Sequence, residues 1–496
     1  MDTTTNGNSL TLEVEGDDAF DARDFTLEEG LSTLFSVDVV ATSSNPAVDF
    51  ESLIGKPAAF SIKGRGADGQ AATQRWSGIL SEIHQLRSEE AGVSTYHLTV
   101  VPKVWLMTQR TNCRVFQQMT DLDVAQAMLA EWGVSPVVST TRAYKTRKYR
   151  VQYNETDHAF VSRLLEAAGV TMIFQRSGDG DTQVVLHDAP ERGATRSLPL
   201  DHLNQPMDGT VCATRFRASR AVRSGKMTFS DHDHRLANAP LLAEASTSAL
   251  DVEQRLEKFT YSPGSFRFGN KGPNDTPFAD DRGRTRTDTD EAQRIASQAA
   301  TAAIARSKRF AFDSNALDLA AGLVFKISGH PLAEKEGDLL VQRVVISGTH
   351  DSEPRLSVNA VAASTGWRPE AVTPQPNVHG VECATIVGPA GETIHTDEFG
   401  RVRVQFHWDR YGKMDENSSL WIHVNQQWSG EGMGSINLPR IGQEVLVGFL
   451  GGDPEEPVVV GRMHTNLKRP PFALPANKTQ SGLRSASVAP NGGDAG

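Results

Sequence analysis

Short runs of β-branched and aromatic residues, broken by Gly, Asp and Pro, recur along most of this 496-residue chain. Five examples are FSVDVVATS (35–43), AAFSIKG (58–64), YHLTVVP (96–102), VQRVVISG (341–348) and RLSVNAVAA (355–363). Apolar residues that alternate with polar ones, or cluster between turn residues, indicate strands that bury one or both faces. We therefore expect a mainly β protein, and the length allows two to four domains.

Three segments instead show helical periodicity with capping residues at their ends. Residues 120–133 begin with Thr120 or Asp121 as N-cap and end at Gly133. Residues 156–169 repeat that pattern, and residues 288–309 are alanine-rich, with acidic residues first and basic residues last, as the helix dipole favours. We expect helices at these three places, inserted into β-barrels.

Two distant parts of the chain resemble each other at an offset of about 260 residues. The matching pairs are FSIKG (60–64) with FKISG (325–329), GILSEIH (78–84) with LVQRVVI (340–346), and YHLTVVPKVW (96–105) with RLSVNAVAASTGW (355–367). This duplication predicts two similar β-barrels, at about 1–110 and 200–367. We place both in a first domain, residues 1–370, with an α/β insertion at 110–195.

A linker with three prolines, residues 366–380, separates this domain from a second one. Five short strand-like runs with Gly- and Asp-rich turns then follow within residues 378–468, a spacing typical of an OB-fold barrel. From residue 469 to 496 the strand periodicity ends. We expect a neck and a flexible tail there.

The stretch 397–430 gathers His407, Asp409, Ser418 and His423, as an active site could. Its strand RVRVQFHW (401–408), however, alternates strictly. One side carries residues that we expect in the core of the OB barrel together with Trp421, namely Val402, Val404, Phe406 and Trp408. The other side carries Arg401, Arg403, Gln405 and His407, which we expect on a solvent or interface face. No strained GxSxG turn is present, so we predict a barrel wall and no catalytic residues.

The best metal candidates are His232 and His234 in SDHDHRL (230–236), which would share one face of a strand. A zinc site needs at least a third protein ligand, and no HExxH motif or cysteine pair supplies one. Cys113, Cys212 and Cys383 are far apart and fit no disulfide framework. We predict no metal and no cofactor, and a metal-dependent enzyme is the distant alternative.

The net charge of −11 argues against binding to nucleic acid or to anionic membranes. The polar, acidic N-terminus MDTTTNGNSLTLEVEGDD is unlike a signal peptide, and no apolar run reaches the roughly 18–20 residues of a membrane span. We expect a cytoplasmic protein that leaves the cell, if at all, by another route than general secretion.

Two blocks of the sequence closely resemble the VgrG (valine–glycine repeat protein G) family, which forms the spike of type VI secretion systems. They are GPAGETIHTDEFGRVRVQFHWDRYGKMDENSSLWIHVNQQWSGEGMG (388–434) and PRIGQEVLVGFLGGDPEEPVVVGRMHTNLKRPPFALPANKTQSGLRS (439–485). Upstream, four segments match the family in order: FTLEEGLSTLFSVDVV (25–40), WLMTQRTNCRVFQQMT (105–120), YNETDHAFVSRLLEAAGV (153–170) and YSPGSF (261–266).

The resemblance implies a fusion of a phage baseplate hub with the base of a membrane-puncturing needle. It implies a homotrimer, whose six barrels would face a six-fold, Hcp-type tail tube. Further partners would be a PAAR-repeat tip protein, baseplate proteins, and effector toxins or their adaptors. The protein would assemble in the bacterial cytoplasm and leave by sheath contraction, carrying effectors into target cells.

The chain departs from the family at its C-terminus. Family members continue past KTQSGLRS (478–485) into valine-rich repeats that build a β-helix needle, whereas this chain adds only ASVAPNGGDAG (486–496). We therefore expect the needle to be absent. A phage tail or an extracellular contractile injection particle uses similar parts and is the main alternative.

Overall fold

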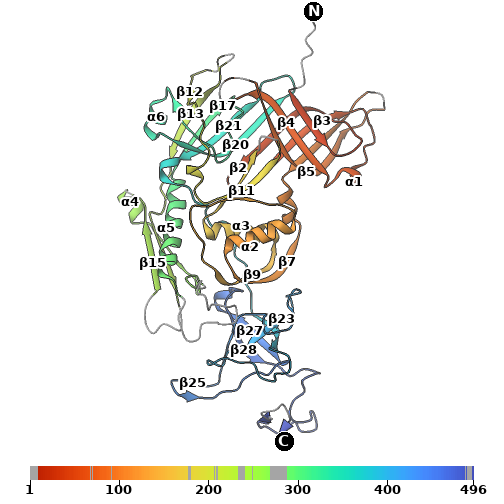
Figure 1. Ribbon diagram of the computed structural model, residues 1–496, viewed down its shortest axis with the longest axis vertical. Helices are drawn as coiled ribbons and strands as arrows, with labels where there is room; N and C mark the ends of the chain where they lie inside the picture. Colours follow the sequence, from red (N-terminus) through yellow and green to blue (C-terminus); the bar gives the residue numbers. More distant parts are fainter. Residues whose placement is uncertain are drawn as a thin grey trace, which may run out of the picture.

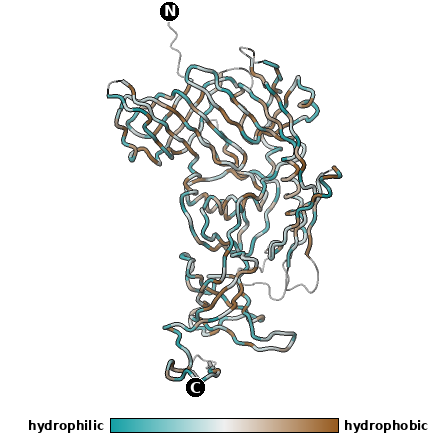
Figure 2. Tube along the Cα trace, turned by 180° about the vertical axis from the view of Figure 1, so that it is seen from behind, coloured by the Kyte–Doolittle hydropathy of each residue, from teal (hydrophilic) through white to brown (hydrophobic). Residues whose placement is uncertain are grey.

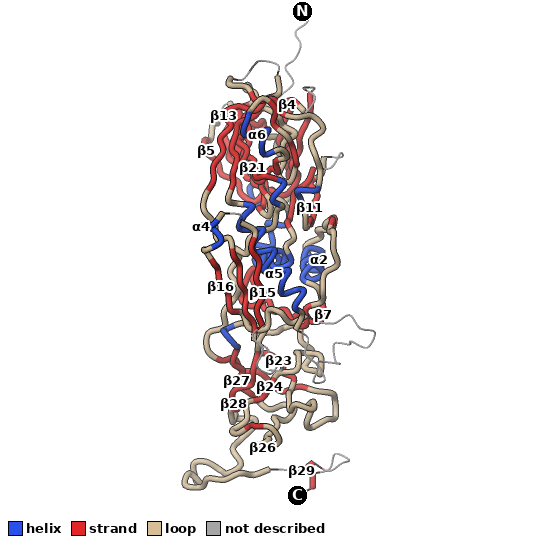
Figure 3. Tube along the Cα trace, turned by 90° about the vertical axis from the view of Figure 1, so that its left-hand side faces the viewer, coloured by secondary structure: helices blue, strands red, loops and turns tan. Residues whose placement is uncertain are grey.

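The structure is a computed structural model. It describes residues 9–485 except 67–68, 70, 91, 177–179, 206, 208–209, 233–240, 249 and 269–286, together with two short strands, β29 (Ser487–Val488) and β30 (Asp494–Ala495). The molecule is elongated, with β-barrels at one end, a tier of helices in the middle and a smaller barrel at the other end (Figures 1 and 3). Within the described ranges, no helix combines the length and the apolar character that crossing a membrane requires.

The first barrel has six strands in the spatial order β1-β4-β5-β6-β3-β2. They are β1 (Leu10–Val14), β2 (Asp21–Gly30), β3 (Thr33–Ser43), β4 (Pro57–Arg65), β5 (Ala71–Arg87) and β6 (Ser94–Val101). All neighbours are antiparallel, and β1 also lies against β2. The short helix α1 (Phe50–Leu53) precedes β4, and a 3₁₀ turn, η1 (Lys103–Thr108), follows β6.

The second barrel is closed by one kinked strand. Its elements are β12 (Leu200–His202), β13 (Cys212–Arg220), β17 (Lys308–Ser314), β18 (Val324–Phe325), β19 (Ile327–Ser328), α6 (Pro331–Glu336), β20 (Leu339–Thr349), β21 (Arg355–Ala362) and η3 (Ala363–Thr365). Strands β18 and β19 are consecutive, yet β18 pairs with β20 whereas β19 pairs with β12. The barrel therefore closes at this kink.

The predicted duplication is confirmed by strand order. The first barrel contains the order β4-β5-β6-β3-β2, and the second contains β18-β20-β21-β17-β13, each with a 3₁₀ turn after its third strand. Strands β2 and β3 of the first barrel correspond to β13 and β17 of the second. A tight turn at Leu31 and Ser32 joins β2 to β3, whereas residues 221–307 join β13 to β17. A whole layer is thus inserted where the first barrel has only a hairpin turn.

The two barrels share one 13-stranded sheet, because β2 also pairs with β20. Phe25 lies opposite Gly348 and Leu27 opposite Ile346 in this antiparallel pair. Hydrophobic and hydrophilic residues alternate along many of these strands (Figure 2). One hydrophobic core runs through both barrels and into the helical insertion.

The insertion between the barrels contains two of the predicted helices. Its elements are β7 (Thr111–Met119), α2 (Asp121–Glu131), β8 (Val137–Ser139), β9 (Arg147–Thr156), α3 (Asp157–Ala168), β10 (Thr171–Arg176), β11 (Thr182–His187) and η2 (Pro190–Arg192). The Thr120 and Thr156 side chains cap α2 and α3, and Gly169 ends α3 in the left-handed conformation at φ 74°. Helical periodicity and the capping residues together predicted both helices to within about two residues.

A separate layer lies on the flank, in the inserted part of the second barrel. It consists of β14 (Lys226–Asp231), β15 (Leu241–Ser246), α4 (Asp251–Gln254), β16 (Glu257–Tyr261) and the predicted third helix, α5 (Thr289–Ala305). Ala292 and Ala296 of α5 pack with Phe266, Leu241 and Ala243 in a small core. Helix α5 ends before residue 309, because Lys308 already begins β17.

The C-terminal barrel has five strands in the order β23-β22-β27-β28-β24. They are β22 (Val381–Val387), β23 (Arg403–Phe406), β24 (His423–Val424), β27 (Glu444–Phe449) and β28 (Pro457–Arg462), with the turn η4 (Leu450–Gly452) after β27. A two-stranded ribbon, β25 (Ser429–Gly430) and β26 (Met433–Gly434), projects from this barrel (Figure 1).

Candidate functional site

The structure places the predicted core residues of the small barrel as follows. Val402, Val404 and Phe406 are buried in its hydrophobic core. Trp408 packs at the edge of this core and stacks on Phe406, with ring centroids 4.8 Å apart. Trp421 is buried outside it and stacks on His395 at 4.8 Å.

The prediction that the polar side of strand 401–408 faces solvent or an interface is wrong for three of its four residues. Arg401, Arg403 and Gln405 are buried, and only His407 is exposed. The segment after the strand folds back over this side, and its carbonyl groups accept hydrogen bonds. Arg403 Nη1 donates to Glu416 O at 2.7 Å, and Gln405 Nε2 donates to Asp409 O at 3.0 Å. Buried polar groups thereby obtain the partners that they need.

The residues that suggested catalysis serve separate structural contacts. His407 Nε2 lies 2.6 Å from Glu444 Oε1 on the surface. The Asp409 carboxylate accepts hydrogen bonds from the backbone amides of Tyr411 and Gly412, and Ser418 Oγ accepts one from Asp415 N. A serine–histidine–carboxylate relay would need these groups to contact one another, and none of these hydrogen bonds joins them.

The metal candidates are only partly visible. His232 is exposed at the end of β14, and His234 lies outside the described residues. The neighbouring Asp231 carboxylate accepts hydrogen bonds from the backbone amides of His232, Gly264 and Phe266, so it shapes the turn. Over the part of the chain that the structure describes, no group of three or more His, Cys, Asp or Glu residues could hold a metal ion.

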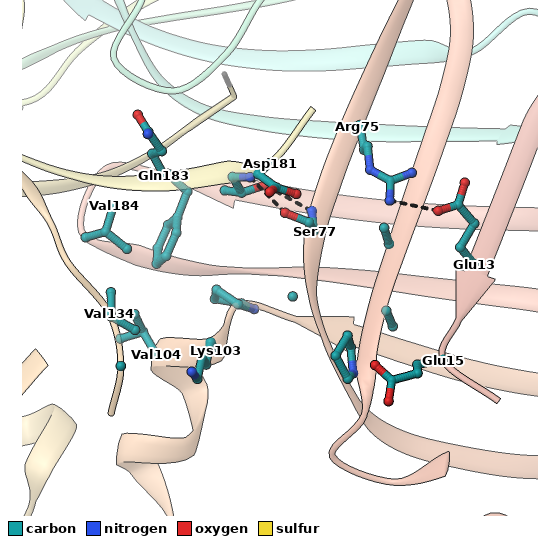
Figure 4. A pocket seen from close by; sticks show the side chains of 18 of the residues that line it. Glu13, Glu15, Arg75, Ser77, Lys103, Val104, Val134, Asp181, Gln183 and Val184 are labelled. Carbon is teal, nitrogen blue, oxygen red and sulfur yellow. Dashed lines mark hydrogen bonds and ion pairs between the residues drawn. The ribbon is translucent and has the colours of Figure 1, made fainter. Parts of the chain in front are cut away.

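A cleft of about 610 Å³ separates the first barrel from the β10–β11 sheet (Figure 4). Arg75 donates to Glu13 at 2.7 Å on its rim, and the hydrogen bond holds the pKa of Glu13 below its ordinary value. Ser77 and Thr182 exchange two hydrogen bonds, from each backbone amide to the other's hydroxyl, and so connect the two walls. The lining residues include no histidine or cysteine, and the arrangement fits a structural seam.

The most unusual electrostatic site lies where β9 meets the small barrel. Arg150 donates to both carboxylate oxygens of Asp121, at 2.7 and 3.1 Å, and to Glu455 Oε2 at 2.5 Å. Glu455 also lies 3.6 Å from Arg163. All four side chains are almost completely buried. A buried charge is tolerated only when it is paired, so residues 300 positions apart neutralise one another here.

The pKa values at this junction follow from burial and pairing. Burial raises the pKa of Asp121, but Arg150 and Arg147 outweigh it and lower the pKa to about 2. Burial lowers the pKa of Arg147 to about 10, with repulsion from Arg150 adding to the effect. Burial, followed by repulsion from Glu455, raises the pKa of Asp453 to about 6. Burial at this junction thus brings the pKa of Asp453 closer to neutral pH.

Further contacts extend the junction along β7 and β9. Tyr153 Oη donates to Glu382 Oε1 at 2.7 Å, and its ring meets Trp408 edge-on at 5.7 Å. Gln117 Nε2 donates to Asn417 O at 2.7 Å. Outside these strands, Arg267 of the flanking layer forms an ion pair with Glu456. The small barrel is thus fixed to the insertion by directional polar contacts, which set its orientation.

Two protein families match the chain in the order that the fold shows. Residues 28–352 match the phage tail baseplate hub (GPD) family. Residues 391–464 match the type VI secretion system/phage-baseplate injector OB domain. The chain is also 32% identical over 477 residues to the type VI secretion system spike protein VgrG1a of Pseudomonas aeruginosa, covering 92% of this chain and 70% of that protein.

This chain belongs to the VgrG family. VgrG1b of the same organism is also 32% identical over 477 residues, and the chain covers 60% of its length. The chain thus spans about two thirds of the length of these VgrG relatives.

Solved structures of low sequence identity share the fold. The Escherichia coli c3393 protein, described as a type VI secretion component similar to phage T4 tail proteins gp27 and gp5, has a TM-score of 0.63 and 20% identity, covering 91% of this chain and all of that one. The half-lidded Francisella PdpA–VgrG complex contains a chain with a TM-score of 0.59 and 10% identity, covering 98% of this chain and 82% of that one. The hub and OB architecture is therefore shared with these structures.

Sequence reasoning missed the charged junction of this VgrG chain. Asp121 was considered only as a helix cap, and Arg150 and Glu455 carry no local pattern. In RKYRVQ (147–152), Arg150 shares one side of the strand with the polar residues Lys148 and Gln152, and such a polar side usually faces water. Only the burial of Arg150 against a second domain makes it an element of the junction.

Proposed function

We propose that this chain is the trimeric spike and hub of a type VI secretion system, linking the tail tube to the puncturing tip and carrying effectors. The observation that carries the proposal is the similarity to VgrG spike proteins over both the hub and the OB part. We keep residues 1–370, 378–468 and 469–496 as the proposed hub, OB and neck-and-tail divisions.

The duplicated barrels support a symmetry-matching role. Each chain carries two barrels of similar strand order within one sheet. Three chains around a common axis would present six such barrels, which suits a six-fold, Hcp-type tube. Homo-oligomers with closed cyclic symmetry are the usual way to build such an adaptor.

The role that we propose is mechanical, with no enzymatic activity. Of the residues that suggested chemistry, His407, Asp409 and Ser418 are engaged in the barrel wall and its turns, and Asp231 shapes a turn beside His232. The buried ion pairs instead fix the OB barrel to the hub, as a spike under axial load requires. The chain's net charge of −11 does not favour nucleic acid as a partner.

The partners that we propose are the tube protein, a PAAR-repeat tip protein, baseplate proteins, and effectors or their adaptors. The name of the Francisella PdpA–VgrG complex supports the idea that a VgrG chain can bind a further protein. We propose assembly in the bacterial cytoplasm, followed by delivery out of the cell through contraction. A phage tail or an extracellular injection particle is the second candidate, because the hub family itself is described from phage tails.

Light scattering at several protein concentrations tests the trimer. A trimer has three times the chain mass of 53.8 kDa, about 161 kDa. A mass of one chain at every concentration would contradict a trimer that this chain forms by itself. Elemental analysis of the same sample tests the enzyme alternative, because a bound metal above about 0.2 ions per chain would revive it.

Deleting the gene in its native host tests whether the protein serves a type VI secretion system. A type VI spike is expected to be required for release of the tube protein into the medium of intact, growing cells. Undiminished release without the gene would contradict the proposal. Release that occurs only upon cell lysis would favour the phage alternative.

A further inference from the structure

The ribbon formed by β25 and β26 exposes large apolar side chains that its own chain does not cover. The exposed fractions are 64% for Trp428, 64% for Met433 and 76% for Ile436. In the ribbon, Gly430 lies opposite Met433, and Ser435 N donates to Trp428 O at 2.9 Å. Because paired residues of antiparallel strands share a face, Trp428 and Met433 project from the same side.

The base of the ribbon is held by specific hydrogen bonds. Asn437 N donates to Gln426 Oε1 at 3.0 Å, and Arg462 Nη1 donates to Asn437 Oδ1 at 2.8 Å. The ribbon is therefore a fixed projection of the small barrel (Figure 1). Exposed apolar residues on a pre-organised projection indicate an interaction site, because ordering it costs nothing further on binding.

The same barrel presents an apolar sheet face. Ala384, Val445, Val447 and Val459 fill the core, so alternate residues of β22, β27 and β28 point outward. At one end of the sheet these outward residues are Val381, Cys383, Leu446, Gly448 and Val460, of which Val381 is 51% and Val460 is 44% exposed. At the other end they are the polar residues Thr385 and Glu444, so only the first end forms the apolar face.

The register brings these outward residues together. Val381 lies opposite Gly448, and Cys383 lies opposite Leu446. A Cβ atom on Gly448 would lie only 3.2 Å from Val460 Cγ1, so the Val460 side chain leans over this glycine. The resulting apolar surface is flat, because Gly448 has no side chain. A flat surface suits the broad ring of a tryptophan.

We propose that the ribbon of one chain, through Trp428 and Met433, docks on the outer face of β22, β27 and β28 in a second copy of this chain. The proposal rests on the trimer proposed above and names its contact surfaces in the OB part. The occupant is a second copy because one chain carries both halves, a projecting apolar ribbon and an apolar face, and leaves both exposed.

The contact is heterologous, because the two chains contribute different surfaces to it: one contributes the ribbon and the other contributes the sheet face. Such a contact closes into a ring only if each step rotates by the right angle, and a rotation of one third of a turn gives a trimer. In such a trimer, the ribbon of each chain contacts the sheet face of the next chain. All three ribbons and all three sheet faces are then covered.

Cross-linking tests the proposal directly in the full chain. The native Cys383 already lies on the proposed face, so Met433→Cys places a second thiol on the ribbon. Oxidation, or a short bismaleimide, should join Met433→Cys chains into covalent trimers of about 161 kDa on a denaturing gel. The matched control combines Met433→Cys with Cys383→Ser and should remain at 53.8 kDa. Products that depend on Cys383 but stop at dimers would overturn the ring.

Light scattering separates this proposal from the trimer itself. Trp428→Ala is expected to raise the concentration at which the assembly half-dissociates by at least about tenfold, as for a buried tryptophan at an interface. A wild-type trimer that Trp428→Ala leaves unchanged, with no Cys383-dependent cross-link, would overturn the ribbon contact and leave the trimer standing. A wild-type monomer at every concentration, without cross-links, would overturn both.

Discussion

Glu455→Gln is expected to loosen the junction between the small barrel and the hub. The substitution keeps the shape of the side chain but removes the negative charge that faces Arg150 at 2.5 Å and Arg163 at 3.6 Å. Breaking a buried ion pair by removing one partner costs about 3–5 kcal/mol when the other charge is left alone. Here Arg150 keeps both hydrogen bonds to Asp121, so the loss is closer to that of one charge-assisted hydrogen bond, about 2 kcal/mol.

A loss of about 2 kcal/mol corresponds to a roughly thirtyfold larger equilibrium constant for opening of the junction. Hydrogen exchange measured by mass spectrometry on the peptide covering residues 449–457 reports this opening. The amides of Asp453 and Glu456 donate hydrogen bonds within that loop, and both should exchange about thirtyfold faster. Peptides from the two large barrels should not change.

Glu398→Gln is the matched control, because it makes the same chemical change at an exposed glutamate of the small barrel. It should alter exchange by less than about twofold, in line with surface substitutions. If Glu455→Gln behaved like this control, the buried ion pairs would not stabilise the junction, and the reasoning would be refuted.

Two further perturbations test the half-buried carboxylate of Asp453 and the buried carboxylate of Glu29. Burial, followed by repulsion from Glu455, raises the pKa of Asp453 to about 6 in the folded protein. As the pH falls, the folded protein therefore binds this proton near pH 6, whereas the unfolded chain binds it only near pH 3.8. The wild type should therefore gain stability relative to Asp453→Asn between pH 7.5 and 4.5, by about 2–3 kcal/mol in urea titrations; a difference that does not vary with pH would contradict this. Glu29→Ala should destabilise the hub by about 3–5 kcal/mol, because Trp76 Nε1 at 2.8 Å and the Arg176 guanidinium at 3.5 Å both lose their buried acceptor. A loss of unfolding free energy below about 1 kcal/mol in urea titrations would contradict this prediction. It would show that Trp76 and Arg176 find other partners when Glu29 is removed.

The elements that sequence reasoning found are those with local causes. The helix α3 is an example, because Thr156 caps its start and Gly169 ends it, and both signals lie within one turn of the helix. The strand 401–408 was visible for a similar reason, since a two-residue period reports which side of a strand is apolar. The duplication was visible because segments about 260 residues apart resemble each other.

The two-residue period does not predict what covers the polar side of strand 401–408. Arg403 and Gln405 alternate with apolar residues just as solvent-facing residues do, yet carbonyl groups of the following segment cover them. A polar row on a strand is equally compatible with water and with buried acceptors. Its burial depends on the path of a segment that carries no periodic signal.

The sequence by itself determined the strand-rich composition, the capped helices and the OB spacing, because each is encoded over a few neighbouring residues. It also determined the two-barrel repeat, because segments about 260 residues apart resemble each other. Only the tertiary structure decided that β2 pairs with β20 and that Arg150 meets Glu455. Contacts over 300 residues depend on how whole domains dock, and a single charged residue offers the same local pattern whether it ends up in water or in a buried pair. The junction that orients the small barrel on the hub is therefore a property of the folded chain alone.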